Sequence, residues 1–257
     1  MGRVIATISG GKASAWCANW ALKTYRKEDV LLYFNDTKWE HPDLYRFLND
    51  LSEYLNHPIF FDSDGRTPEE LFYDHRALAN NRMPFCSRIL KAERLQKYYQ
   101  DGDTLVFGLG VEELNRGKRV VAVYQKVAAK TGKMCRIELP LITNEVTKEE
   151  VDKFISSTGI KEPLLYRLGF THNNCSGGCV RAGKKHWKML YERLPEVYLE
   201  RERVEEDIRK FLNKDVHYLK DITLREFRGK IERKELSKYY DTDDIEIECI
   251  GICDSMS

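Results

Sequence analysis

Near its N-terminus the chain reads Arg3-Val-Ile-Ala-Thr-Ile-Ser9-Gly10-Gly11-Lys12-Ala13-Ser14, a β-branched run that enters a loop of small residues. An apolar segment that favours a helix follows. The glycine pair permits a tight turn, the serines offer hydroxyl groups, and Lys12 offers a positive charge. Because these groups precede a helix, its positive N-terminal end adds to them. The pattern predicts a phosphate-binding loop between a strand and a helix, and an ordinary glycine-rich turn is the alternative.

Length and composition restrict the class of protein. The 257 residues are 42% hydrophobic and 32% charged, and the net charge is +1. These values are typical of a soluble globular protein, and they exclude a uniformly basic nucleic-acid binder while leaving a local basic patch open. No apolar run is long enough to cross a bilayer and no signal-peptide pattern is present, so we expect a cytoplasmic protein without a membrane partner. In that compartment the seven cysteines are candidates for metal or redox chemistry.

Strand-like and helix-like patterns alternate through the first part of the chain. Short β-rich runs occupy residues 4–7, 30–34, 59–61 and 104–107. An amphipathic segment at 13–23 joins the first two runs, and Pro42 opens a second helical pattern. This alternation predicts a Rossmann-like α/β fold with a mainly parallel sheet, helices on both faces and a ligand at the carboxyl ends of the strands.

The rest of the chain has a different composition. Residues 184–212 are helical in pattern and densely charged, and residues 181–238 carry 17 basic and 12 acidic side chains. We therefore expect two domains, a nucleotide-binding domain at 1–183 and a charged helical region at 184–257 that ends in a cysteine pair. The basic excess is typical either of a solvated helical face or of a surface for a polyanionic partner.

Two segments resemble a known family. The loop at 9–14 resembles the Ser-Gly-Gly-x-x-Ser loop of the PP-loop ATP pyrophosphatases and PAPS reductases. Residues 34–42, Phe-Asn-Asp-Thr-Lys-Trp-Glu-His-Pro, resemble the Asp-Thr-Gly-x-Glu-x-Pro segment that lies beside the nucleotide in the PAPS reductase family. Asp36 would there accept hydrogen bonds from a ribose or an adenine amine, and a turn residue is the alternative. Lys38 stands where the family usually has glycine, so we expect a different backbone at that point.

Later segments extend the resemblance in the same order. Residues 84–91 resemble the family's Cys-x-x-x-x-Lys segment, and residues 108–116 resemble its Gly-x-x-x-x-Glu-Ser-x-Arg segment. Residues 139–151 resemble the stretch that begins a late helix, and residues 165–180 resemble the Tyr-x-x-Gly segment with its cysteine pair. The chain is therefore identified as a member of the PP-loop superfamily, similar to the PAPS-reductase-like proteins of bacteria and phages.

The resemblance implies ATP and Mg²⁺ as cofactors and assigns residues to them. The candidate nucleotide-binding residues are Ser9, Gly10, Gly11, Lys12, Ala13, Ser14, Asp36, Arg88, Lys91, Gly108 and Glu112, with Arg119 as a further cation. Lys12 and Arg116 are candidate catalytic cations, because positive charge stabilises a leaving pyrophosphate. Cys249 is the candidate catalytic thiol.

The spacing of the cysteines predicts a metal or redox centre. Cys175-Ser-Gly-Gly-Cys179 and Cys249-Ile-Gly-Ile-Cys253 each leave three residues between the thiols, and the glycines let both thiolates face one metal. In relatives, a cysteine placed like Cys86 joins a downstream pair to hold a [4Fe–4S] cluster. The implied ligands are Cys86, Cys175, Cys179 and either Cys249 or Cys253. His172 and His186 flank the first pair, and either imidazole could complete the site, with ordinary surface histidines as the alternative. Structural zinc on the two pairs and free thiols are the alternatives.

Three functions stay open. In the first, an ATP pyrophosphatase adenylates an acceptor such as a nucleic-acid base and transfers sulfur to it, with a sulfur- or electron-donor protein as partner. In the second, the chain reduces adenylyl sulfate or its 3′-phosphorylated form to sulfite through Cys249. The family's Glu-Cys-Gly-x-His ending is here Glu-Cys-Ile-Gly-Ile-Cys at 248–253, without the histidine. In the third, the chain binds a nucleotide without turnover, as a sensing subunit.

Overall fold

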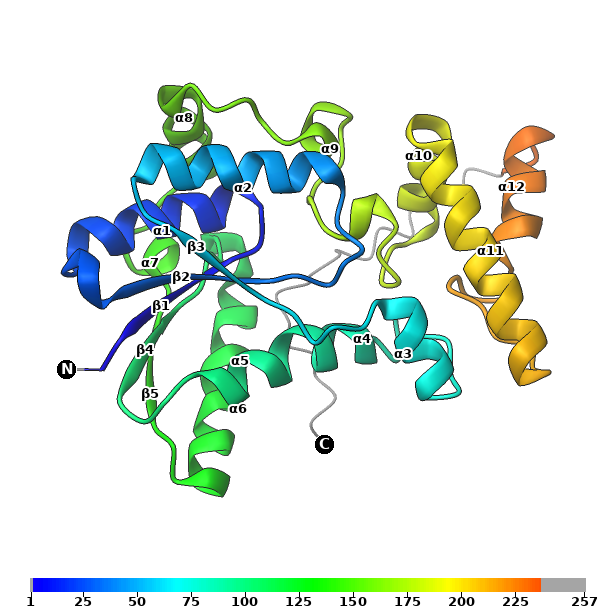
Figure 1. Ribbon diagram of the computed structural model, residues 1–257. Coiled ribbons are helices and arrows are strands. Elements are labelled where there is room, and N and C mark those ends of the chain that lie inside the picture. The colour runs from blue at the N-terminus through cyan, green and yellow to red at the C-terminus, as the bar shows by residue number, and fades with distance from the viewer. Residues whose placement is uncertain (1, 237–257) are drawn as a thin grey trace. The chain divides into compact units, whose positions relative to one another are not determined.

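The computed structural model describes residues 2–236 and contains a sheet of five parallel strands in the order β3-β2-β1-β4-β5 (Figure 1). The strands are β1 (Val4–Ile8), β2 (Val30–Asn35), β3 (Ile59–Asp62), β4 (Asp103–Val106) and β5 (Cys135–Glu138). In the register, Val4 lies opposite Val30 on β2 and opposite Thr104 on β4. The strand order reverses between β1 and β4. Their carboxyl ends therefore form the switch point at which open α/β sheets bind ligands.

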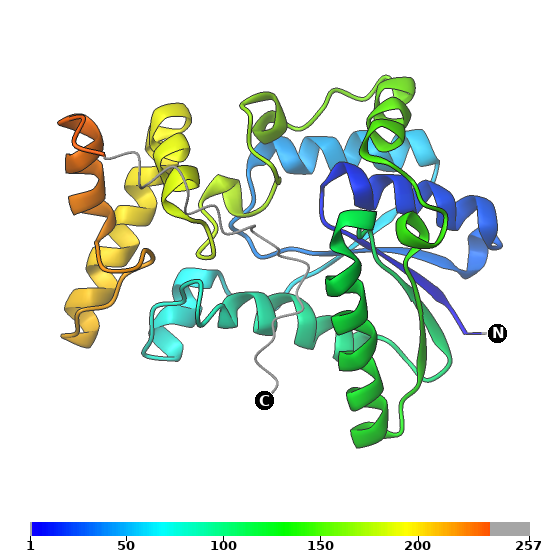
Figure 2. The same cartoon turned by 180° about the vertical axis from the view of Figure 1, so that it is seen from behind.

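Helices cover both faces of this sheet. Figures 1 and 2 show α1, α2 and α8 on one face and α5 and α6 on the other. The bounds are α1 (Lys12–Thr24), α2 (Pro42–Leu55), α5 (Glu93–Tyr98), α6 (Leu114–Thr131), α7 (Pro140–Thr143) and α8 (Lys148–Thr158). Small residues such as Ala15 and Ala18 let α1 approach the strands closely, and they are fully buried in one apolar cluster with Leu32 of β2.

The chain forms two compact units that interleave along the sequence. Unit 1 consists of residues up to 36, 42–63 and 93–164, and it contains the sheet. Unit 2 consists of residues 37–41, 64–92 and the chain from 165 onward. The domain boundary expected between residues 183 and 184 falls inside unit 2.

Unit 2 is built from short helices around an aromatic core. Its elements are α3 (Pro68–Asp74), α4 (Phe85–Ser87), a π-helical turn (Arg88–Ala92), α9 (Leu164–Arg167, which starts at the unit boundary), α10 (Lys184–Arg193), α11 (Pro195–Leu212) and α12 (Leu224–Glu232). Helices α10, α11 and α12 lie side by side (Figure 1). Trp187, Tyr198 and Phe227 are fully buried where these helices meet α3 and the segment at 37–41. None of the described helices is long and apolar enough to cross a bilayer.

Most of the predicted elements are present, and the α/β fold is confirmed. Four predicted strands and the helices beginning near residues 13 and 42 occur within one or two residues of their expected positions. The late helix expected near residue 147 is α8, and it begins with a capping box: Thr147 Oγ1 accepts from the Glu150 N–H at 3.2 Å, and the Glu150 carboxylate accepts from the Thr147 N–H at 2.8 Å. Strand β5 has no counterpart in the prediction, because its half-exposed sequence Cys-Arg-Ile-Glu carries two charges in four residues.

Candidate functional site

The Ser9–Ser14 loop leaves β1 and leads directly into α1. Its own serines hold it closed: Ser14 Oγ accepts hydrogen bonds from the Ser9 N–H and the Ser9 hydroxyl, both at 3.1 Å. The same hydroxyl donates to the Gly11 carbonyl oxygen at 2.9 Å, and Ser14 is buried. The loop is therefore fixed by internal contacts, which reduces the entropy that a bound phosphate would otherwise have to remove.

Two glycines bring the surrounding backbone close to this loop. Gly10 has φ +76°, and a Cβ there would lie 2.7 Å from the side chain of Leu44 on α2. At Gly108, just beyond β4, a Cβ would lie 2.8 Å from the backbone N and Cα of Ser14. The end of β4 can approach the start of α1 only because residue 108 has no side chain.

The start of α1 differs from those of three other helices. Gly11 caps α1 without a side-chain hydrogen bond, and the first turn of α1 holds no acidic residue among those described. Helices α3, α8 and α12 each begin instead with a threonine–glutamate capping box. A glutamate in a capping box occupies the N–H groups and the positive dipole end that an anion would use. The N-terminus of α1 therefore carries no such internal anion.

Lys12 is engaged by two carboxylates of unit 1. Its Nζ lies 2.5 Å from Asp152 Oδ1 on α8 and 2.8 Å from Glu162 Oε1 in the segment after α8. Burial lowers the pKa of Lys12, but hydrogen bonds to the two carboxylates outweigh it, so the pKa lies above its ordinary value. Lys12 is thus a protonated cation next to the glycine pair.

Asp36 directly follows the carboxyl end of β2, the neighbour of β1. Its carboxylate accepts a hydrogen bond from the Tyr45 hydroxyl at 2.7 Å, and its N–H donates to the Asp62 carbonyl oxygen at 2.8 Å. Lys38, two residues later in unit 2, has φ +58°, the left-handed region that glycine favours. Lys38 thus adopts a conformation that a glycine would also adopt readily, and the expected backbone difference from the family stays a prediction.

The segment after β4 holds two further candidates in ion pairs. Glu112 Oε1 lies 2.9 Å from Lys148 Nζ, and although burial raises the pKa of Glu112, the hydrogen bond from Lys148 lowers it below its ordinary value. Arg116 is buried and pairs with Glu113 one helical turn away. Arg119 is exposed on α6. These residues all lie in unit 1, like the Ser9–Ser14 loop.

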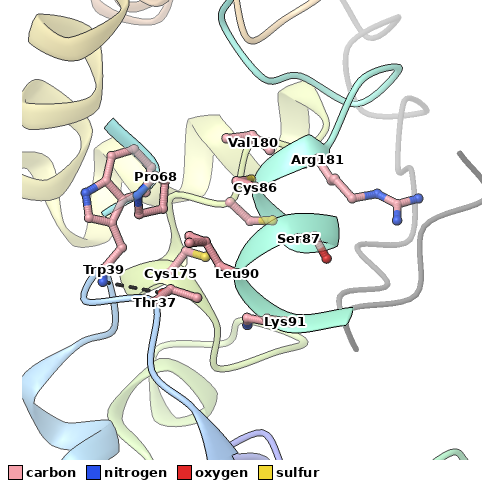
Figure 3. A pocket seen from close by; sticks show the side chains of 11 residues that line it. Thr37, Trp39, Pro68, Cys86, Ser87, Leu90, Lys91, Cys175, Val180 and Arg181 are labelled. Atoms are coloured by element: carbon pink, nitrogen blue, oxygen red, sulfur yellow. Dashed lines mark hydrogen bonds between the residues drawn. The ribbon is translucent and has the colours of Figure 1, made fainter. Parts of the chain in front are cut away.

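Arg88 and Lys91 belong to unit 2, where three predicted cysteines line one cavity. Cys86 comes from α4, Cys175 and Cys179 come from the loop before α10, and Lys91 and Arg181 add positive charge (Figure 3). The lining is completed by Thr37, Trp39, Pro68, Ser87, Leu90 and Val180. Cys86 lies just before the π-helical turn and Lys91 lies within it. Turns of π-helix often occur at functional sites.

A buried glutamate links Lys91 to the cysteine loop. Glu40 accepts a hydrogen bond from the Cys175 N–H at 2.5 Å and another from the Thr37 hydroxyl at 3.0 Å. Lys91 Nζ lies 3.5 Å from Glu40 Oε1, and the Glu40 side chain is 1% exposed. Lys91 thus supplies the counter-charge that a buried carboxylate requires. The hydrogen bond from the Cys175 N–H to Glu40 fixes the backbone at Cys175.

The loop from Cys175 to Cys179 is tightly constrained. Cys175 and Ser176 have φ values of +52° and +54°, which are uncommon for residues with a side chain. The Ser176 hydroxyl donates to the Trp39 carbonyl oxygen at 3.0 Å. A Cβ at Gly178 would lie 2.9 Å from Nε of Arg201, whose guanidinium lies 3.6 Å from the centre of the Trp39 ring. The glycine at 178 therefore makes room for a buried arginine.

Two histidines stack beside this loop. The rings of His172 and His186 are 4.8 Å apart and nearly parallel, and both residues are buried. A ring nitrogen of His186 lies 2.6 Å from the Gly177 carbonyl oxygen. Burial lowers the pKa of His172 to about 3, with smaller contributions from His186 and Lys91. Both rings therefore pack in the interior of unit 2 and not at its surface.

The described residues fit a metal centre only in part. Three thiols line one cavity, yet within residues 2–236 no group of three or more His, Cys, Asp or Glu side chains is arranged to hold a metal ion. Cys249 and Cys253, the other expected ligands, lie outside the described residues. We therefore derive no chemical step through a cluster.

Some residues around these sites were not predicted from the sequence. Glu40, Trp39 and Arg201 surround the cysteine loop, and Asp152 and Glu162 bind Lys12. Glu40 belongs to the 34–42 segment that resembles the family, but nothing local to it indicates a partner 135 residues away. A buried arginine within a densely charged helix gives no sequence signal at all.

Comparison with known proteins supports the family. The model of the phosphoadenosine phosphosulfate reductase domain family matches residues 3–182, which include the Ser9–Ser14 loop, Cys86 and the Cys175–Cys179 loop. A search of curated proteins gives no match. The matched region spans well over half of the chain and contains all five strands. The chain therefore belongs to the phosphoadenosine phosphosulfate reductase domain family, within the PP-loop superfamily.

Proposed function

We propose that the chain is an ATP pyrophosphatase that adenylates an acceptor and then directs sulfur to it. The observation that carries the proposal is the Ser9–Ser14 loop at the switch point of the sheet, where Gly108 lets β4 approach α1. The first turn of α1 has no acidic residue of its own among the described residues, and this favours a phosphate there. Asp36 at the end of β2 would accept hydrogen bonds from the nucleoside.

In this proposal the first step forms an adenylate. An acceptor oxygen attacks the α-phosphorus of ATP, the bond between the α-phosphorus and the bridging oxygen breaks, and pyrophosphate leaves with the electron pair. Backbone N–H groups of the loop and the cations Lys12 and Arg116 would stabilise the charge on pyrophosphate, and Mg²⁺ would neutralise part of it. In the second step a sulfur nucleophile attacks the activated carbon, and AMP leaves with the electron pair of the carbon–oxygen bond.

The cysteine cavity of unit 2 supports the sulfur half of the proposal. Cys86, Cys175 and Cys179 line it, and the Glu40–Lys91 pair fixes the loop that carries the last two. A [4Fe–4S] cluster on these thiols with a C-terminal cysteine would provide a site for sulfur or electrons. Anaerobic purification followed by iron, sulfide and zinc analysis tests this part. Iron and sulfide that fall in Cys86→Ser and Cys175→Ser support it, whereas zinc alone contradicts it.

A nucleic-acid acceptor stays a prediction. Its phosphates would contact basic side chains of α10 to α12, but several of these already have carboxylate partners. The paired residues are Arg203 with Glu69 and Asp207, Arg209 with Asp215, Arg225 with Glu206, Arg228 with Glu202 and Glu232, and Arg233 with Glu235. Salt-dependent binding of tRNA or DNA, measured by fluorescence anisotropy, tests the prediction.

A second candidate, reduction of an adenylyl sulfate to sulfite, is favoured by the name of the matched family domain. Its nucleophile would be Cys249, outside the described residues. Anaerobic calorimetric titration with ATP and then with adenylyl sulfate and its 3′-phosphorylated form, in Mg²⁺, separates the two. Tighter binding of ATP supports the pyrophosphatase, and tighter binding of a sulfonucleotide with sulfite release supports the reductase. Binding of ATP without AMP release in the presence of candidate acceptors supports a sensing subunit.

A variant of the Ser9–Ser14 loop tests whether the nucleotide binds there, whichever nucleotide is preferred. The double variant Ser9→Ala with Lys12→Ala removes one hydroxyl and one cation from the loop while leaving the buried Ser14 in place. We expect an unchanged fold by circular dichroism and a loss of nucleotide binding. Unchanged affinity in this variant would contradict the assignment of the loop.

A further inference from the structure

The contact between Lys12 and its two carboxylates has a consequence for the phosphate loop. Lys12 is the first residue of α1, directly after the glycine pair, and its side chain is 24% exposed. A phosphate in the loop would attract the same ammonium group that Asp152 and Glu162 now hold at 2.5 and 2.8 Å. Phosphate and carboxylates therefore compete for one cation.

The elements that carry the two carboxylates are held in place by other contacts. Helix α8 packs on α1 through the buried residues Val151 and Ile155. The chain at 161–164 is tied to the start of α2, since Arg46 donates to the Lys161 carbonyl oxygen at 2.9 Å and Asp43 accepts from the Leu164 N–H at 2.6 Å. Asp152 and Glu162 thus approach Lys12 from two segments that other contacts hold in place. The fold of unit 1 therefore positions both carboxylates at Lys12.

The contact is also of a kind that a ligand can displace. The side chains of Asp152 and Glu162 are 54% and 36% exposed. Ion pairs as exposed as these contribute little to folding stability. A polyphosphate carries several negative charges, so it can draw Lys12 from its carboxylate partners. While they hold it, the two carboxylates also add negative charge near the loop and weaken the attraction of a phosphate.

We propose that Asp152 and Glu162 are positioning residues that hold Lys12 and set the affinity of the loop for phosphate. This inference rests on the proposed nucleotide site. It adds that the affinity is limited by a competing acidic pair, so removal of the pair's charge strengthens binding. A purely structural tie between α1 and α8 would act in the opposite direction, because its loss would loosen the loop.

The test uses the full chain and two isosteric substitutions, Asp152→Asn and Glu162→Gln, singly and together. Affinity is measured by calorimetry for ATP, for inorganic pyrophosphate and for adenosine, which lacks phosphate. We expect the double variant to bind ATP and pyrophosphate about tenfold more tightly and adenosine as before, with a gain that shrinks as salt rises. Adding Lys12→Met should abolish the gain. Glu149→Gln, an exposed carboxylate of the same helix, is the matched control and should change little.

Each outcome is decisive. Unchanged or weaker ATP binding in the double variant, with a normal melting curve, would overturn this inference while leaving the nucleotide site intact. An equal gain for adenosine, or a gain that persists with Lys12→Met, would also overturn it. Failure of the wild type and of every variant to bind ATP, pyrophosphate or a sulfonucleotide would overturn the proposed function together with this inference.

Discussion

The two units place their polar groups in different environments. In unit 1 the buried side chains are mostly apolar, with Asp62, Asp103 and Arg116 as buried charged residues, and the functional candidates lie near the carboxyl edge of the sheet. Unit 2 buries more charge, since Glu40, Arg201, Glu202 and Glu205 are all buried, as are two histidines. Apolar packing dominates unit 1, whereas unit 2 depends more on contacts that satisfy its buried polar groups. Substitutions should therefore destabilise the units for different physical reasons.

The largest effect is expected in unit 1 at Gly10. Alanine there must adopt φ +76° and place its Cβ 2.7 Å from the buried Leu44 side chain. Strain in the left-handed region and overpacking together should cost about 4 kcal/mol of unfolding free energy. Gly132→Ala is the control, because residue 132 has φ +73° with nothing within 4 Å of a Cβ. Urea denaturation should give a smaller loss of about 1–2 kcal/mol there. Equal losses at both positions would show that Leu44 adjusts.

The next effect concerns a buried acid of unit 2. Glu205 on α11 accepts the N–H groups of Tyr218 and Leu224 at 2.8 and 2.6 Å, and burial raises its pKa from 4.5 to about 7. The folded state therefore binds this proton more tightly than the unfolded chain, so the contribution of Glu205 to stability is fully present below pH 4.5 and is lost as pH rises to about 7.

The difference between wild type and Glu205→Gln isolates this contribution. Because each pKa unit corresponds to about 1.4 kcal/mol, wild type should lose on the order of 3 kcal/mol relative to the variant between these pH values. Denaturant titrations of both proteins at several pH values measure it. Parallel stability curves would show that Glu205 does not titrate in this range.

A smaller effect is expected at Gly178, where the cause is packing alone. Its φ is −92°, so alanine causes no backbone strain, but the Cβ would meet Nε and Cγ of the buried Arg201 at 2.9 and 3.0 Å. We expect a loss of about 2 kcal/mol in unfolding free energy. In an Arg201→Ala background the same substitution should cost much less. If Gly178→Ala loses as much unfolding free energy in the Arg201→Ala background as in wild type, the added methyl group does not clash with Arg201.

The smallest effect is expected at Lys38. Replacement by glycine relieves the left-handed strain at φ +58° but loses the hydrogen bond from Lys38 Nζ to the Gly65 carbonyl oxygen and adds entropy to the unfolded chain. These contributions oppose one another, so the melting temperature should hardly change. Lys38→Ala keeps the strain and loses the hydrogen bond, and it should therefore melt below Lys38→Gly. The reverse order would contradict the assigned strain.

The contrast between the units also explains what the sequence could predict. Strands β1, β2 and β4 of unit 1 were predictable because each contains a short apolar or β-branched run, and the turns that follow β1 and β4 carry their glycines in the sequence. The shared cavity of Cys86, Cys175 and Cys179 was suggested only by family resemblance. The contacts of Lys12 with its carboxylates and of Arg201 with Trp39 join residues far apart in the chain. No local sequence pattern indicates such contacts, and only the structure shows them.

The interleaving of the units has a consequence for cooperativity. The chain passes from one unit to the other after residues 36, 41, 63, 92 and 164, so no single cut separates the two. A truncation after residue 183 would leave the sheet complete but remove Trp187, Tyr198 and Phe227 from the core of unit 2. The segments at 37–41 and 64–92, inserted within unit 1, would then lose their apolar cover. The helical region at 184–236 therefore belongs to the same folding unit as the segments that carry Glu40 and Cys86, and we expect it to melt together with them.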